Sequence, residues 1–88
     1  MAKHEYKFTL EFRPAASKDL ESLPKEVRRE VGFALDRLQR DLAGDVKKLK
    51  GHKFEYRLRV GSYRVRFELI GNLITGYNVG DRKDIYDR

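Results

Sequence analysis

The sequence predicts an α+β fold in which two N-terminal helices pack on one face of a mostly antiparallel four-stranded sheet. Three observations lead to this prediction. Apolar and polar residues alternate over 6–12, 54–60 and 63–69, helical periodicity fills the interval after the first of these segments, and a two-residue turn joins the last two. A chain of 88 residues has room for one domain, 1–88, with element order βααβββ.

The N-terminal half contains one strand and two helices. Alternation over 6–12 is typical of a half-buried strand. Pro14 opens a short helix that stops near Ser22, and a second helix begins at Pro24 and ends at Gly44. The apolar residues of the second helix recur at helical spacing: Val27, Val31, Ala34, Leu35, Leu38 and Leu42. We expect both helices to pack on the sheet rather than to carry an active site.

The C-terminal half contains a β-hairpin and one further strand. The predicted strands are 54–60, 63–69 and 73–79, with the hairpin turn at Gly61 and Ser62. Residues 45–53 are expected to form a basic connection before the hairpin, and 80–86 an irregular or short helical tail.

Positive charge is concentrated in the second half of the chain. Residues 1–44 hold nine basic and eight acidic side chains, whereas 45–88 hold eleven and six. Within 47–66 there are eight basic residues and one acidic residue. Together with the formal net charge of +6, this distribution favours an acidic partner, either nucleic acid or an acidic protein.

The expected hairpin register brings four arginines together. Pairing across the two-residue turn sets Arg59 opposite Arg64. The next pair on the same face is Arg57 opposite Arg66. Like charges placed directly opposite each other destabilise a sheet by up to about 1 kcal/mol per pair. A phosphate chain lying across a concave basic face would remove that cost, because guanidinium groups suit phosphate oxygens; the alternative is a solvated polar face.

The position of Tyr77 depends on the turn before the last strand. A strict two-residue turn places Tyr77 beside Arg66 on the basic face and Asn78 on the core side, whereas a β-bulge reverses both. We expect Tyr77 to have a structural role, with stacking on a nucleic-acid base as the functional alternative.

Composition excludes several kinds of site. The chain has no cysteine, which excludes disulfides, thiolate metal sites and cysteine nucleophiles. Its two histidines, His4 and His52, form no cluster for a metal, and no glycine-rich nucleotide loop is present. We therefore expect neither a metal nor a cofactor.

The same composition argues against a membrane protein. No apolar run approaches the roughly 20 residues needed to cross a bilayer. Charged residues interrupt the first twelve positions, so no signal-peptide core is apparent there. The expected location is the cytoplasm.

A basic site without a metal is suited to cleaving RNA, because RNA supplies its own nucleophile, the 2′-hydroxyl. Arginines stabilise the extra charge on the pentacoordinate phosphate. They cannot accept a proton near neutral pH. Lysines crowded by other cations, His52 or Tyr86 are the candidates for moving protons.

Three stretches of the chain carry a family resemblance: Lys48–Gly51 (KLKG), Tyr56–Val65 (YRLRVGSYRV) and Val79–Tyr86 (VGDRKDIY). In residues, spacing and order of elements they resemble the RelE/ParE toxin superfamily, and the match covers essentially the whole chain. The closing Arg-Lys-Asp-Ile-Tyr resembles the RelE branch, whose members cleave messenger RNA in the ribosomal A site. The ParE branch inhibits DNA gyrase.

The resemblance implies a set of site residues. The implied catalytic residues are Arg57, Arg59, Arg64, Arg82 and Tyr86. Arg64 and Arg82 would clamp the scissile phosphate, and Tyr86 would stack on or orient a codon base. The residues expected to bind RNA or the ribosome are Lys47, Lys48, Lys50, Lys53, Arg66 and Lys83.

Structural alternatives remain for several of these residues. Arg82 could pair with Asp81 or Asp84, the Tyr86 ring could pin the tail to the sheet, and the lysines could form a solvated loop. The best-known ribosome-dependent members have lysines where this chain has Arg57 and Arg59. The general base is therefore left unassigned.

The resemblance implies the toxin of a type II toxin–antitoxin system, acting as a ribosome-dependent endoribonuclease, or mRNA interferase, that inhibits translation. Its implied partners are a cognate RelB-like antitoxin, the ribosome and messenger RNA, with operator DNA bound only through the antitoxin complex. Two alternatives stay open. One is a ParE-like gyrase inhibitor without nuclease activity, and the other is a non-catalytic RNA-binding module.

Overall fold

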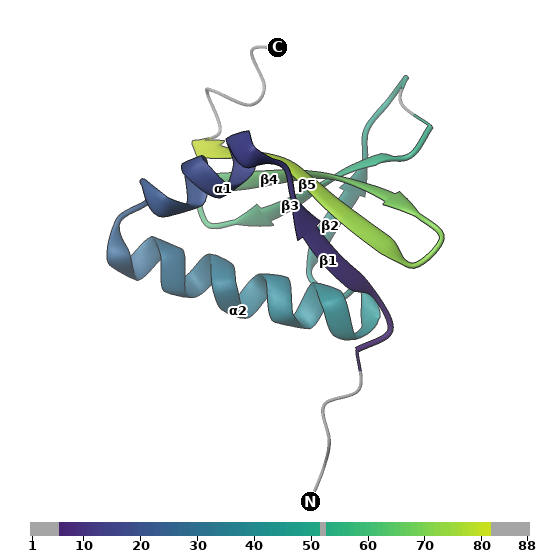
Figure 1. The fold of residues 1–88 in the computed structure, drawn as a ribbon, viewed down its shortest axis with the longest axis horizontal. Helices are drawn as coiled ribbons and strands as arrows, with labels where there is room; N and C mark the ends of the chain where they lie inside the picture. The colour runs from purple at the N-terminus through teal and green to yellow at the C-terminus, as the bar shows by residue number, and fades with distance from the viewer. Residues whose placement is uncertain (1–5, 52, 82–88) are drawn as a thin grey trace, which may run out of the picture.

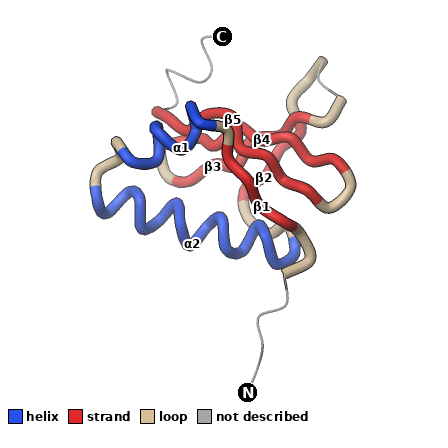
Figure 2. Tube along the Cα trace, viewed as in Figure 1, coloured by secondary structure: helices blue, strands red, loops and turns tan. Residues whose placement is uncertain are grey.

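The computed structural model describes residues 6–51 and 53–81, which form a five-stranded sheet with two helices on one side (Figures 1 and 2). The elements in chain order are β1 (Thr9–Phe12), α1 (Pro14–Glu21), α2 (Lys25–Asp41), β2 (Asp45–Lys48), β3 (Glu55–Val60), β4 (Tyr63–Ile70) and β5 (Leu73–Asp81). The strand order is β1-β5-β4-β3-β2, with β1 parallel to β5 and the other pairs antiparallel. The predicted α+β class is confirmed.

The predicted number of strands was one too few. β2 lies inside the segment expected to be a basic connection, and it pairs with β3 so that Asp45 lies opposite Arg59 and Lys48 opposite Tyr56. The four residues of β2 include one apolar side chain, Val46, and therefore show no alternation. Pairing with a neighbouring strand, rather than a local pattern, creates this element.

Both helices start as their prolines predict. Pro14 is the first residue of α1, and Pro24 caps the N-terminus of α2. α2 ends before Gly44 because Leu42 adopts the left-handed conformation, with φ of 58°, and its amide donates a hydrogen bond of 2.7 Å to the carbonyl oxygen of Leu38. Neither of these two described helices has the length and apolar character needed to span a bilayer.

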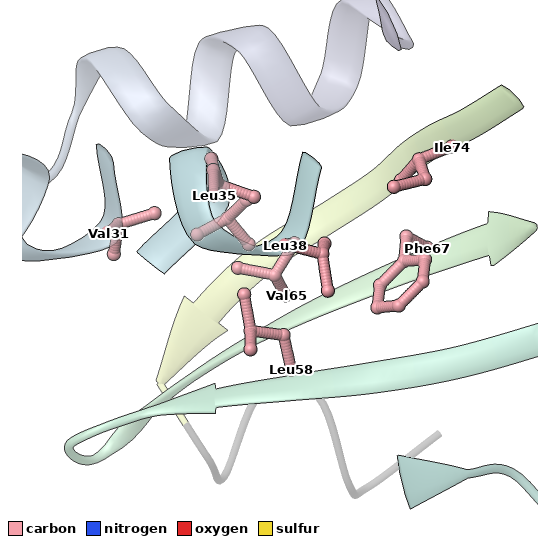
Figure 3. Close-up of a cluster of buried hydrophobic side chains, with 8 residues drawn as sticks. Val31, Leu35, Leu38, Leu58, Val65, Phe67 and Ile74 are labelled. Atoms are coloured by element: carbon pink, nitrogen blue, oxygen red, sulfur yellow. The ribbon is translucent and has the colours of Figure 1, made fainter. Parts of the chain in front are cut away.

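The hydrophobic core lies between α2 and one face of the sheet (Figure 3). Val31, Leu35 and Leu38 of α2 point toward the sheet residues Leu58, Val65, Phe67 and Ile74. Side chains alternate between the two faces of a strand. The arginines that alternate with these core residues on β3 and β4 therefore lie on the opposite face, which we call the open face.

α1 packs on the end of the sheet where β5 finishes. Its Ala16 is completely buried, and Leu20 packs against the core. The backbone N–H of Val79 donates a hydrogen bond of 3.0 Å to the Asp19 carboxylate. α1 thereby fixes the last part of β5, beside the arginines of β4.

A close approach at Gly76 predicts opposite effects for two glycine substitutions. A Cβ at Gly76 would lie 2.5 Å from the Phe12 ring on β1, so Gly76→Ala should destabilise the fold by about 1–3 kcal/mol through overpacking. A Cβ at Gly32, inside α2, would meet no atom within 4 Å. Gly32→Ala should therefore stabilise the fold by roughly 0.5–1 kcal/mol, because alanine has the higher helix propensity. Urea unfolding measures both free energies, and a stable Gly76→Ala variant would contradict the packing.

Candidate nucleic-acid interface

The open face carries the four hairpin arginines in the predicted register. Arg59 lies opposite Arg64, and Arg57 lies opposite Arg66. β2 extends both rows across the sheet. Asp45 joins the row of Arg59 and Arg64, and Lys47 joins the row of Arg57 and Arg66.

Two of the four arginines are buried although they belong to the open face. The exposed fractions of Arg57 and Arg64 are 9% and 5%. Arg64 Nη1 donates hydrogen bonds to the carbonyl oxygens of Gly61, at 3.2 Å, and Tyr63, at 3.1 Å. The turn therefore holds this guanidinium in a fixed position.

Arg57 is held less completely. Within the described part of the chain, its Nη1 atom is buried without a hydrogen-bond partner, and Asp45 Oδ1 lies 3.9 Å away. The Nε atom of Arg66, directly across the strand pair, is also buried without a partner among these residues. Unpaired buried donors are costly, so an acceptor that reached either nitrogen would stabilise the protein.

Two carboxylates on the open face offset part of the arginine repulsion. Arg59 Nε lies 2.7 Å from Asp45 Oδ2, and Arg66 Nη2 lies 2.7 Å from Glu55 Oε1. The first pair is about half exposed, whereas each side chain of the second is 22% exposed. Neither pair was predicted from the sequence, and the first depends on β2, which shows no alternation. The position of Glu55 on the arginine face was the one available signal for the second pair.

The positive charge is confined to one end of the open face. Beyond the row of Arg57 and Arg66, Glu55 lies opposite Glu68. The same row continues across β5 through Thr75 to Glu11 on β1. Phosphate groups are attracted to the two arginine rows near the hairpin turn and repelled by this acidic row, which gives the interface a boundary.

A β-bulge determines the surroundings of Tyr77. The β4–β5 register shifts between Arg66, which pairs with Asn78, and Phe67, which pairs with Gly76. Tyr77 is therefore the extra residue. Asn78 lies opposite Arg66, as the bulge alternative predicts.

Tyr77 itself does not enter the core, contrary to that alternative. The guanidinium carbon of Arg13 lies 4.7 Å from the centre of its ring. Burial, followed by a hydrogen bond with Glu68 and the negative charge of Glu68, raises the pKa of Tyr77. These contacts favour the structural role expected for this residue.

The predicted binding lysines lie in different parts of the structure. Lys47 pairs with Arg57 and shares its face, whereas Lys48 pairs with Tyr56, which stacks on Phe67 of the core. The structure therefore brings Lys47, but not Lys48, to the arginines. Lys50 and Lys53 are exposed in the segment between β2 and β3.

Three predicted site residues, Arg82, Lys83 and Tyr86, lie outside the described residues. β5 extends to Asp81, so its pairing includes two residues that were expected to belong to the tail. Gly80 lies opposite Arg64, and Asp81 lies opposite Tyr63. The described chain thus ends beside the hairpin turn.

The chemistry available on this face is anion binding. In the ranges 6–51 and 53–81, no group of three or more histidine, cysteine, aspartate or glutamate side chains is placed to hold a metal ion. Four guanidinium groups on paired strands instead present several N–H donors to one region. That arrangement suits phosphate oxygens.

Comparisons with known proteins agree with the resemblance predicted from the sequence. Toxin RelE3 of Methanocaldococcus jannaschii is 39% identical over an alignment of 75 residues, and the match covers 80% of this chain and 85% of that protein. The RelB–RelE antitoxin–toxin complex from Methanococcus jannaschii contains a chain that is 35% identical, with a TM-score of 0.74 over 86% of this chain and 94% of that one. The isolated E. coli RelE toxin, at 22% identity, shares the fold with a TM-score of 0.75 over 84% of this chain and 83% of its own.

A family match covers most of the chain. Residues 10–86 match the family described as "ParE toxin of type II toxin-antitoxin system, parDE". The chain therefore belongs to the RelE/ParE superfamily and is a RelE-like toxin of a type II toxin–antitoxin system.

Proposed function

We propose that this toxin is a ribosome-dependent endoribonuclease that cleaves messenger RNA in the A site and thereby inhibits translation. The observation that carries the proposal is the cross-strand pair of Arg57 and Arg66 on the open face. Arg57 Nη1 and Arg66 Nε are both buried without a hydrogen-bond partner among the described residues. A phosphate oxygen would supply the missing acceptor. The 39% sequence identity to a RelE toxin supports the same function.

The cleavage needs no metal because RNA carries its own nucleophile. The 2′-hydroxyl attacks the adjacent phosphorus, the bond to the 5′-oxygen breaks, and the products carry a 2′,3′-cyclic phosphate and a 5′-hydroxyl. The pentacoordinate phosphate has extra negative charge, which fixed guanidinium groups stabilise without reorganising. Arg64, held by two carbonyl oxygens of the turn, is suited to this role.

The remaining site residues have further roles in this proposal. Arg57 and Arg59 bind the phosphate, Arg82 completes the clamp and Tyr86 stacks on or orients a base. Neither arginine on β3 can accept the proton of the 2′-hydroxyl near neutral pH. Lys47, Lys50 and Lys53, with Arg66 and Lys83, bind RNA or the ribosome, and Lys48, on the helix side of β2, is left to contact the ribosome.

We also propose a cognate RelB-like antitoxin as the partner of this toxin. The related toxins of Methanococcus jannaschii and Pyrococcus horikoshii were solved as complexes with RelB. An acidic antitoxin segment is the natural complement of a chain with a net charge of +6. Binding only the folded toxin, it would stabilise the toxin by mass action. Operator DNA would be bound through that complex, in the cytoplasm.

Cleavage on defined ribosomes tests the proposal. Ribosomes with an empty A site and a known messenger RNA are incubated with the protein, and the RNA ends are mapped. Arg59→Ala should lower the cleavage rate by about 10²-fold, because it removes one charged donor to the transition state. Arg29→Ala removes an arginine that is also exposed but lies on α2, away from the arginine rows, and should leave the rate unchanged.

The outcomes separate the candidate functions. Cleavage within the A-site codon that needs ribosomes would support the endonuclease. Well-folded protein that cleaves nothing but blocks DNA supercoiling by gyrase at stoichiometric amounts would identify the gyrase inhibitor instead. RNA binding without any product would identify the non-catalytic binding module.

Two adjacent lysines, Lys47 and Lys48, lie on opposite faces of β2, and this difference gives a further prediction. Lys47→Ala should weaken binding of single-stranded RNA and make the slope of log K against log salt concentration shallower by about 0.7, the value for one phosphate. Lys48→Ala removes the same charge from the helix side of β2, so its slope should stay near that of the wild type. Fluorescence anisotropy over a salt series measures both. Equal slopes for the two variants would argue against the arginine face as the binding surface.

A further inference from the structure

Asp45 has an unusual position among the arginines of the open face. It is the first residue of β2, an edge strand, and lies opposite Arg59. Its Oδ2 atom lies 2.7 Å from Arg59 Nε, and its Oδ1 atom lies 3.9 Å from Arg57 Nη1. One carboxylate therefore faces two guanidinium groups on the same strand, as the oxygens of a phosphodiester group would.

The two contacts of Asp45 are unequal. The pair with Arg59 is close but about half exposed, and exposed ion pairs hold their partners weakly. The contact with Arg57 is too long for a hydrogen bond, so Nη1 keeps no partner within the described residues. A short side chain anchored on β2 does not reach both arginines. A phosphodiester group that is not tethered to the sheet can approach both.

We propose that Asp45 occupies the subsite in which Arg57 and Arg59 bind one RNA phosphodiester, and that RNA must displace it. Asp45 is then a built-in competitor that lowers the affinity of the open face for RNA. The inference rests on the proposed function, because it assumes that RNA binds this face. It adds the location of one phosphate and the residue that this phosphate replaces.

The chain contains a matched control for Asp45. On α2, Asp36 Oδ2 lies 3.1 Å from Arg40 Nη2, and both side chains are about two-fifths exposed. Arg40 also keeps a buried Nε atom without a partner among the described residues. Asp36→Asn and Asp45→Asn thus remove the same charge from similar ion pairs, but only Asp45 faces the arginine rows.

The experiment measures binding of a short single-stranded RNA with 2′-O-methyl groups, which lacks the attacking hydroxyl and cannot be cleaved by this route. Fluorescence anisotropy over a salt series compares wild-type protein with the two variants. Asp45→Asn should bind roughly tenfold more tightly at low salt, as expected for one recovered charge-assisted hydrogen bond. Its salt slope should become steeper by about 0.7. Asp36→Asn should stay within about twofold of wild type, because its charge lies away from the site.

Three results would overturn the inference. Weaker binding by folded Asp45→Asn would make Asp45 a positioning residue that holds the arginines in place. Equal tightening by both variants would show an effect of net charge alone. No binding of the RNA by wild type and Asp45→Asn would remove the subsite altogether. Urea unfolding of both variants establishes that each is folded.

Failure of the proposed function gives a different result from failure of this inference. Wild-type protein that leaves messenger RNA intact on ribosomes while Asp45→Asn tightens RNA binding would overturn the endonuclease and keep the subsite. Normal cleavage together with weaker binding by Asp45→Asn would keep the endonuclease and overturn the subsite.

Discussion

The pairing of β3 with β4 determines what each face of the sheet contains. The two-residue turn at Gly61 and Ser62 sets Val60 opposite Tyr63, and Gly61 has a φ of 61°, which glycine adopts without strain. A slip of one residue would exchange the faces, burying arginines under α2 and exposing Leu58 and Val65. The core and the anion-binding face therefore depend on the same register.

This dependence explains why the hairpin was predictable from sequence. Its turn is local, and its strands alternate strictly between apolar and polar residues. Because α2 must bury the apolar side, the arginines had to fall on the other. The candidate site followed from the same alternation, with no knowledge of distant contacts.

The features that could not be predicted from the sequence depend on tertiary contacts. β2 has one apolar residue and becomes a strand only because β3 offers it a free edge. α2 ends at Asp41, before the Gly44 that the sequence indicated, because Leu42 adopts a positive φ, which leucine seldom does. The sequence left the bulge at Tyr77 as one of two alternatives, and only the pairing of β4 with β5 decides between them. The ion pair of Asp45 with Arg59 could not be assigned without β2.

The parallel pairing of β1 with β5 has a consequence for how the toxin is made. β5 lies between β1 and β4 in the sheet, and its Ile74 and Val79 belong to the core. During synthesis, β1 has no strand beside it, and α2 covers an incomplete sheet, until the ribosome has released β5. Contacts between such distant segments also form slowly. The sheet that supports the arginine face is therefore completed only after β5 has been made, although the β3–β4 hairpin that carries the arginines is local.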